Sequence, residues 1–503
     1  MKRNCSALFL VTLMLGLGVL PAFASAAPEA SGISLGDTPG AAGEMAALEA
    51  AEAGAGEIAV SQEQAPSGGL VDAGSIDESF LSRLLRGLLG IAVLLGVVTL
   101  FSAKRRSIDW LLVAKGLGLQ VLFALLVLKT TWGRGFFRVA NDAFVAVIGY
   151  TNSGARFLFG SLVDYSTPVE GGAGAVNIGA QFAFSVLPVI IFFSSLMTLL
   201  YYLGVMQKVV KSVAWLMQRT LGTSGAETTS AAGNIFVGQV EAPLLIKPFV
   251  KDMTLSELNT VMTGGFATVA GGVLAAYVAM LAAYFPSIAG HLLAASIMAA
   301  PAGIVVSKIL MPETGEPKTR GSLDFELEVT DANAIDAAAS GASDGLKLAL
   351  NVGAMLLAFL ALIAMANGLL GWGLGLFGIE GITLERIFGV VFSPVAWIVG
   401  VPWADAPHIG SLFGIKMVGN EFIAFQNLAT SLSAGVTLNP KSIVIATYAL
   451  TGFANFASIA IQIGGIGGIA PSRRQDLSRL GMRAMLGGTV ATWMTATLAG
   501  VLS

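Results

Sequence analysis

The sequence predicts an all-α integral membrane protein, with about eight membrane-spanning helices and two re-entrant helical hairpins in an inverted repeat. The first observation behind this prediction is composition, because 55% of the 503 residues are hydrophobic and only 12% are charged. A soluble chain could not bury so much apolar surface in one core. The second is a set of stretches without Asp, Glu, Lys or Arg that exceed the roughly 20 residues needed to cross a bilayer. The clearest are 182–205, 260–285 and 442–470.

The chain begins like an exported bacterial protein. Two basic residues precede an apolar run at 7–20, and the small residues 24–26 resemble a signal-peptidase site. We expect residues 1–26 to be a signal peptide; the alternative is an uncleaved first span, for which the apolar run is short. Residues 27–82 are rich in Ala, Gly, Ser and Glu and contain no Lys or Arg. This composition predicts a disordered acidic tail in the periplasm.

The predicted spans follow the tail in order. They lie near 84–103, 109–128, 182–205, 258–284, 289–311, 346–370, 442–470 and 484–502. Basic residues next to spans favour the cytoplasmic side of a membrane. All the basic clusters fall on that side if the mature N-terminus is periplasmic; they are Lys104–Arg106, Lys208–Arg219 and Arg473–Arg483. We therefore expect a multi-pass protein of the bacterial inner membrane with a periplasmic mature N-terminus.

Two further segments do not fit simple spanning. The first hairpin, 222–253, and the second hairpin, 404–432, are moderately apolar and are interrupted by glycine and proline. Each has a glutamate near its middle, Glu241 or Glu421. Counting only one of them as a span would put the last basic cluster on the periplasmic side of the membrane. We therefore predict that both are re-entrant, with tips buried in protein or lining a cavity. The preceding segment, 205–221, has the pattern of an amphipathic interfacial helix.

A short internal repeat, with one copy after each hairpin, is the third observation behind the fold prediction. The stretch 265–270 (GFATVA) resembles 452–457 (GFANFA). The first copy enters from the cytoplasm and the second from the periplasm, so the repeat is inverted. Paired glycine-interrupted segments in inverted halves indicate a transporter whose binding site lies at their interface.

The polar residues of the first hairpin suit a binding site. A carboxylate such as Glu241 costs at least about 2.5 kcal/mol at membrane depth, so it needs a partner or an aqueous cavity. The alternatives are an ion pair with Lys247 or a place at the hairpin mouth. Gln239 offers donors and an acceptor, which suits the edge of a heterocyclic base. Asn234 and the backbone near Val237 offer neutral oxygens of the kind that hold sodium at unwound helices, although such groups also bridge helices.

The second hairpin and the following repeat copy offer a carboxylate, an amide and a hydroxyl. Glu421, Asn455 and Ser458 would together satisfy vicinal sugar hydroxyls; the alternative is a network that bridges helices. Asn455 and Ser458 share a helix face if the segment is helical. Phe453 belongs either to an apolar wall of the site or to ordinary packing. The sequence contains no nucleophile elbow, phosphate-binding loop or metal-binding His pair, so we expect no enzyme and no ATP-driven step within this chain.

These residues resemble the concentrative nucleoside transporter family, bacterial type. The likeness covers residues 84–503 and rests on four motifs in order, namely 238–248 (GQVEAPLLIKP), 262–271 (MTGGFATVAG), 420–425 (NEFIAF) and 449–458 (ALTGFANFAS). The resemblance implies a cation-coupled nucleoside symporter that imports its substrate by an elevator-type alternating-access mechanism. It implies a homotrimer in the lipid bilayer, without nucleic acid or cofactor. Uridine, cytidine or adenosine is the expected substrate.

The resemblance also divides the chain into functional parts. It implies scaffold helices with the interfacial segment over 84–205, a first hairpin repeat over 206–311, a cytoplasmic loop over 312–345, a scaffold helix over 346–370 and a second hairpin repeat over 380–503. The two hairpin repeats would form the mobile transport unit.

Site residues follow from the resemblance by position. The base would be held by Gln239 and Glu241 with Val240 between them and Val273 lining its pocket; the ribose would be held by Glu421, Asn455 and Ser458, beside Phe453. The sodium site would use Asn234, Val237, Thr268 and Val269.

One departure from the family pattern concerns specificity. The family usually has Thr where this chain has Val240, so a possible base contact is lost and the purine or pyrimidine preference stays open. Thr268 keeps a hydroxyl where serine is common, which favours sodium; protons are the alternative, because some relatives use them. Two other readings are a transporter of the same architecture for another polar solute and a nucleoside sensor that does not transport.

Overall fold

The computed structural model describes residues 80–503 except 164–166, 169–174, 177–181, 322–330 and 380. The predicted signal peptide, 1–26, and the predicted tail up to residue 79 lie outside the described residues. The described chain is almost entirely helical, apart from one antiparallel pair of two-residue strands, β1 (Thr167–Pro168) and β2 (Ala175–Val176). The all-α prediction is therefore confirmed.

In the described residues, eight α-helices precede the first hairpin or lie between Leu310 and the second hairpin; two of them, 205–221 and 384–399, fall almost entirely within the predicted repeats 206–311 and 380–503. In chain order they are α4 (Phe80–Leu100), α5 (Trp110–Leu128), α6 (Thr131–Phe159), α7 (Phe182–Ser185), α8 (Leu187–Tyr202), α9 (Val205–Leu221), α16 (Ala334–Gly375) and α17 (Leu384–Val399). Helix α9 coincides with the predicted interfacial segment and buries one face, with Val210, Ala214 and Met217 inside while Trp215 is exposed.

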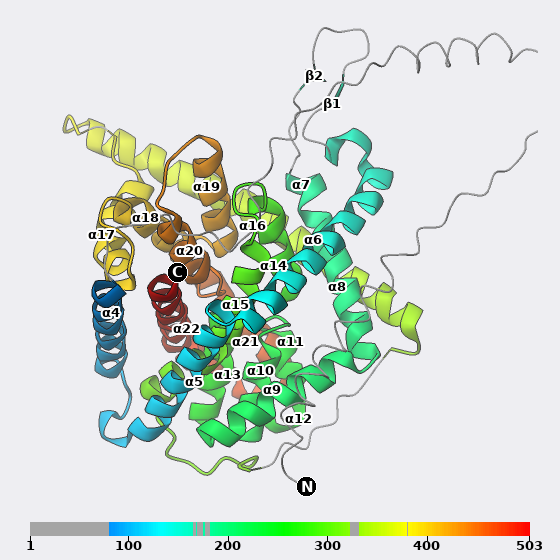
Figure 1. Ribbon diagram of the computed structural model, residues 1–503, viewed down its shortest axis with the longest axis vertical. Coiled ribbons are helices and arrows are strands. Elements are labelled where there is room, and N and C mark those ends of the chain that lie inside the picture. The colour runs from blue at the N-terminus through cyan, green and yellow to red at the C-terminus, as the bar shows by residue number, and fades with distance from the viewer. Residues whose placement is uncertain (1–79, 164–166, 169–174, 177–181, 322–330, 380) are drawn as a thin grey trace, which may run out of the picture. The chain divides into compact units, whose positions relative to one another are not determined.

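The two repeats contain corresponding elements, except that the second arm of the first hairpin is two short helices instead of one. The first consists of α10 (Gly225–Gly233), α11 (Glu241–Leu244), α12 (Lys247–Val250), α13 (Leu255–Ala267), α14 (Gly271–Leu281) and α15 (Ile288–Leu310). The second consists of α18 (Ala406–Val418), α19 (Glu421–Ser433), α20 (Pro440–Leu450), α21 (Phe456–Ile469) and α22 (Arg474–Leu502). In each repeat a hairpin is followed by an interrupted helix and then by a long continuous one (Figure 1).

Two predicted spans are interrupted in the structure. Seven helical segments in the described residues are long and apolar enough to cross a membrane, and the predicted span 442–470 is not among them because α20 and α21 are separate helices. The predicted span 258–284 is likewise divided into α13 and α14. Both interruptions fall on the repeated GFA motifs, at Thr268 and at Asn455, whose backbones are extended. The repeat therefore marks helix breaks.

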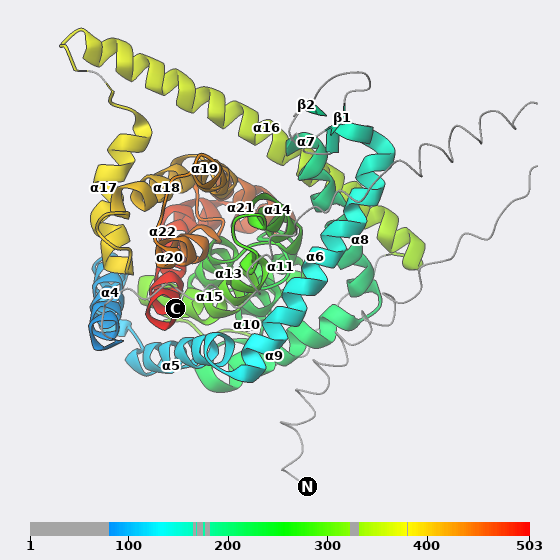
Figure 2. The same cartoon turned by 45° about the horizontal axis from the view of Figure 1, so that its top comes forward.

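The two breaks lie against each other. A Cβ placed on Gly452 would come within 2.4 Å of the Phe266 carbonyl oxygen, so only glycine allows this approach. Helix α13 also packs against α15 and α22, and α20 packs against α15, α18 and α22. Figure 2 shows these helices grouped together, with α16 along one side of the group.

Helix α6 was absent from the sequence prediction. It is amphipathic, with Phe137, Ala140 and Val147 buried on one face and Trp132 and Tyr150 exposed. The search for charge-free runs missed it because arginines interrupt its hydrophobic pattern. Helix α16 also begins before the predicted span 346–370, so the last part of the predicted loop 312–345 is helical.

The long apolar helices differ strongly in burial. In the most apolar window of Leu255–Leu281 and of Ile288–Leu310, 89% is buried, against 22% for Phe80–Leu100 and 17% for Ala334–Gly375. The exposed helices thus present apolar faces that no described part of this chain covers. Such faces are suited to lipid or to another protein subunit.

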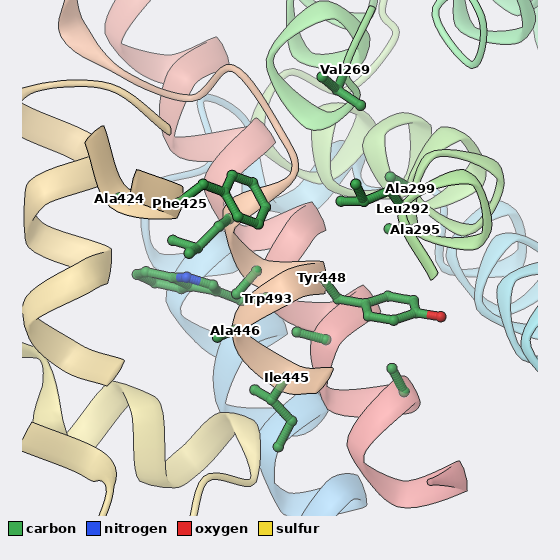
Figure 3. Packing of buried hydrophobic residues seen from close by; sticks show 14 of the residues in the cluster. Val269, Leu292, Ala295, Ala299, Ala424, Phe425, Ile445, Ala446, Tyr448 and Trp493 are labelled. Atoms are coloured by element: carbon green, nitrogen blue, oxygen red, sulfur yellow. The ribbon is translucent and has the colours of Figure 1, made fainter. Parts of the chain in front are cut away.

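The buried helices meet in one hydrophobic cluster. Figure 3 shows Tyr448 of α20 on the side of Leu292 and Ala295 of α15, with Ile445 further along α20 and Trp493 of α22 on its other side. The Tyr448 hydroxyl lies 3.2 Å from His291 Nδ1, so the polar end of this buried ring has a partner. This packing joins the two repeats and fixes the helices that position the site.

Candidate functional site

The first hairpin is built from two short arms that meet at an irregular tip. Helix α10 begins with a capping box, in which the Ser224 N–H donates to the Glu227 carboxylate at 2.8 Å and the Glu227 N–H donates to Ser224 Oγ at 3.3 Å. After Gly233 the chain runs irregularly to Val240. The second arm then consists of the one-turn helices α11 and α12, which contain Pro243 and Pro248. The tip therefore contains backbone groups whose hydrogen bonds are not made within a long helix.

The second hairpin has a sharper turn and longer arms. Helix α18 ends at Val418, and Asn420 caps α19 by accepting a hydrogen bond from the Ile423 N–H at 2.9 Å. Glu421 is the first residue of α19, where the positive end of the helix dipole favours a carboxylate. Its side chain is buried and accepts a hydrogen bond from Asn455 Nδ2 at 2.8 Å. The cap thus places a partnered carboxylate at the hairpin tip.

Helix α21 is started by one of the predicted site residues. Asn455 Oδ1 accepts a hydrogen bond from the Ser458 N–H at 2.8 Å, so Asn455 caps α21 while its Nδ2 bonds Glu421. Ser458 Oγ in turn accepts a hydrogen bond from Gln239 Nε2 at 3.2 Å. Gln239 of the first hairpin is thereby hydrogen-bonded to Ser458 of the second repeat and, through Ser458, connected to Asn455.

These bonds form a continuous polar chain between the repeats. Its members are Gln462, Gln239, Ser458, Asn455 and Glu421, all of which are buried. Four of the five were predicted as site residues. The fifth, Gln462, was missed, although it lies one turn after Ser458 and two turns after Asn455 on the same face of α21.

The other predicted substrate contacts surround this polar chain. Val240 packs against Gly465 of α21, where a Cβ would come within 2.6 Å of Val240 Cγ1. Glu241 is exposed at the tip, with a carboxylate oxygen close to the Gly238 backbone. Phe453 is buried in the break that precedes α21. The hydrogen bonds of the described residues do not link Val240, Glu241 or Phe453 to the polar chain.

Val273 is held near the second hairpin by its neighbour on α14. It is buried, and Tyr277 lies one turn later on the same helix face. The Tyr277 ring stacks on Phe425 at 4.3 Å and meets Phe422 edge-on at 4.9 Å between centroids. This aromatic contact fixes α14 against α19, the helix that begins with Glu421.

The predicted sodium ligands gather where the first hairpin meets the break between α13 and α14. The Gly271 N–H donates to the Phe236 carbonyl at 3.0 Å, which holds the tip against the break. Asn234 is buried, and neither Oδ1 nor Nδ2 has a hydrogen-bond partner in the described chain. The Thr268 hydroxyl donates to the Gly264 carbonyl at 2.9 Å, which leaves its oxygen lone pairs free to accept. Val237 and Val269 lie in the tip and in the break.

The chemistry of these groups suits a monovalent cation. A buried amide oxygen without a partner calls for a ligand or an ordered water. The candidate ligands are neutral oxygens, and among the described residues no group of three or more His, Cys, Asp or Glu could hold a metal. Neutral oxygen donors at broken helices are the usual sodium ligands of transporters, whereas tight divalent sites need carboxylates.

Three family models match the chain. They describe the C-terminus and the N-terminus of Na+ dependent nucleoside transporters and a nucleoside recognition segment, over residues 291–500, 89–162 and 183–284 respectively.

Similar chains and structures agree with these matches. An uncharacterized transporter of Bacillus subtilis is 47% identical over 421 residues, which span 83% of this chain and 99% of that protein. Sodium/nucleoside cotransporter 1 of Rattus norvegicus is 41% identical over 441 residues, which span 85% and 65%. The structure of CNTnw in an inward-facing substrate-bound state has a TM-score of 0.75 and 46% identity, covering 84% of this chain and 98% of its own. A CNTnw variant in an outward-facing state has a TM-score of 0.74 and 45% identity, covering 83% and 97%.

Proposed function

The chain belongs to the concentrative, Na+ dependent nucleoside transporter family, and from this premise we propose that it imports nucleosides by symport with sodium. The family consists of multi-pass membrane transporters rather than enzymes. The observation that carries the proposal is the polar chain, because it brings the first hairpin and the second repeat together through buried side chains that bind by hydrogen bonds.

We assign the two hairpins to different parts of the substrate. Gln239 and Glu241, with Val240 and Val273 beside them, would bind the base, since an amide and a carboxylate match the donors and acceptors of a base edge. Glu421, Asn455 and Ser458 would bind the ribose. This ribose assignment is supported by the hydrogen bond from Asn455 to Glu421, because a carboxylate that is already oriented accepts hydrogen bonds from hydroxyls at little further cost. Phe453 would form the apolar wall.

Sodium is the proposed coupling ion and is carried as a substrate. Asn234, Thr268 and the carbonyl groups of Val237 and Val269 would bind it. The unpartnered amide of Asn234 supports this assignment, as does the place of Thr268 at a helix break. Because the same tip holds Gln239 and Glu241, binding of the ion would order the residues that bind the base.

Transport would proceed by alternating access with an elevator-type movement. The family's solved structures include inward-facing and outward-facing states. The buried repeats would move as the transport unit, and the exposed apolar helices α4, α5, α8 and α16 would contact lipid and the other subunits of a homotrimer. The protein would lie in the bacterial inner membrane with its mature N-terminus in the periplasm.

The test is uptake of labelled uridine into proteoliposomes that contain the purified protein, with and without an inward sodium gradient. We expect accumulation that requires the gradient and is inhibited by unlabelled cytidine or adenosine. Uptake driven only by a proton gradient would replace sodium with protons. Uptake of a different polar solute, with no competition by nucleosides, would contradict the proposed substrate, and nucleoside binding without exchange would favour a sensor.

A further inference from the structure

Gln462 makes two hydrogen bonds through one nitrogen. Its Nε2 donates to the Met262 carbonyl oxygen of α13 at 3.1 Å and to Gln239 Oε1 at 3.0 Å. The side chain is completely buried. Gln462 therefore connects the second repeat to both the helix and the tip of the first.

The Met262 carbonyl determines the direction of this network. A backbone carbonyl accepts hydrogen bonds and never donates them, so the Gln462 atom facing it must be the amide nitrogen. The same nitrogen faces Gln239, and the Gln239 atom opposite it must then be an acceptor, Oε1. Turning the Gln239 amide over would bring two NH2 groups together in a buried place.

The fixed orientation of the Gln239 amide determines what its nitrogen, Nε2, can bind. Its Nε2 donates one hydrogen to Ser458 Oγ at 3.2 Å and keeps a second hydrogen for a ligand. An unrestrained glutamine can turn either its oxygen or its nitrogen to a ligand, whereas here the oxygen faces Gln462 and the nitrogen keeps a hydrogen to donate. The arrangement is tightly enclosed, since a Cβ on Gly265 would come within 2.8 Å of both Gln239 Cβ and Gln462 Nε2.

We propose that Gln462 is a positioning residue that makes Gln239 a hydrogen-bond donor and thereby sets the base preference of the transporter. The inference rests on the proposed function, in which Gln239 binds the base. A base with a carbonyl group opposite Gln239 gains a hydrogen bond, while one with an amino group there meets a second donor. Uridine and cytidine differ by this exchange at C4, so in a pose that places C4 opposite Gln239 the transporter prefers uridine, the 4-oxo nucleoside.

The experiment replaces Gln462 with methionine, which has similar length but no amide. In Gln462→Met, Gln239 is free to turn over, and the uridine-to-cytidine ratio of kcat/KM for uptake falls about five-fold toward unity, the effect of losing one hydrogen bond. Gln120→Met is the matched control, because Gln120 is also fully buried and bonds a single side chain, Thr495 Oγ1 at 3.1 Å. Its ratio stays at the wild-type value.

The ratio is independent of how much protein is folded, because both nucleosides are measured on the same preparation. If Gln462→Met transports neither nucleoside, the same ratio is obtained from equilibrium binding to the purified variant. An unchanged ratio in either assay overturns the role of Gln462 and leaves nucleoside transport intact. A wild type that takes up neither nucleoside overturns the proposed function instead.

Discussion

The two hairpins place their glutamates in opposite ways. Glu421 opens a continuous helix, is 4% exposed and is bonded to Asn455. Glu241 opens a helix of a single turn and is exposed at the tip. A carboxylate that is already oriented suits the constant part of a ligand, and an open one tolerates a variable part. The difference therefore supports the proposal that the second hairpin binds the ribose and the first binds the base.

The repeated GFA motifs also differ between the two repeats, in the hydrogen bonds that their fourth residues make. Thr268 of the first copy stands at the position of Asn455 in the second. The Thr268 hydroxyl is bonded to the carbonyl one turn earlier, whereas the Asn455 amide caps the next helix and holds Glu421. One helix break thus lies at the candidate cation site and the other at the polar chain proposed to bind the substrate. The two copies differ at two positions, Thr268 against Asn455 and Val269 against Phe456, and the first of these accounts for the different hydrogen bonds.

The largest effect is expected from Glu421→Gln. Loss of the charge weakens the hydrogen bonds to the ribose, and uptake of uridine at equal protein should fall by about 100-fold or more, since each charge-assisted bond contributes roughly 1.5–3 kcal/mol. Proteoliposome uptake measures this. Glu385→Gln is a matched control, because Glu385 bonds Asn367 at 3.0 Å outside the site and should transport like wild type. Normal uptake by Glu421→Gln would remove the second hairpin from the site.

A smaller effect, limited to the ion, is expected from Thr268→Val. Removal of the hydroxyl should raise the sodium concentration for half-maximal uptake by about ten-fold while uptake at saturating sodium is largely kept. Thr447→Val is the control, because the Thr447 hydroxyl is bonded to the carbonyl one turn earlier in the same way, at 2.8 Å, and lies in α20. If both variants respond alike, the effect of Thr268→Val does not come from a cation site at Thr268.

The smallest effect is expected from Val240→Thr. Threonine has nearly the same shape, so packing against Gly465 is kept while a hydroxyl is added beside Gln239 and Glu241. Competition of uridine uptake by a panel of nucleosides should change by about two- to five-fold, and the order among bases should change more than the total rate. An unchanged order would place Val240 outside the base pocket.

The sequence was sufficient for the fold class and for most of the polar chain. Hydropathy predicted the long apolar helices, and the spacing of Asn455 and Ser458 placed them on one helix face. The break at Asn455 was not foreseen, because a hydropathy window reads an apolar stretch as continuous. Gln462 was missed because its partners, Gln239 and Met262, are far away in sequence. Helix α6 was missed because its arginines interrupt the charge-free runs by which the spans were recognised.

The assignment of the base to the first hairpin and the ribose to the second is tested most directly by equilibrium binding. Uridine and 3′-deoxyuridine are bound to the purified protein in the presence of sodium. Wild type should bind uridine about ten-fold more tightly, as loss of a hydroxyl bonded to a carboxylate requires. Glu421→Gln should lose most of this difference, and Glu241→Gln should keep the ten-fold difference while binding both ligands more weakly. Loss of the difference in Glu241→Gln, with its retention in Glu421→Gln, would contradict the assignment of ribose to the second hairpin.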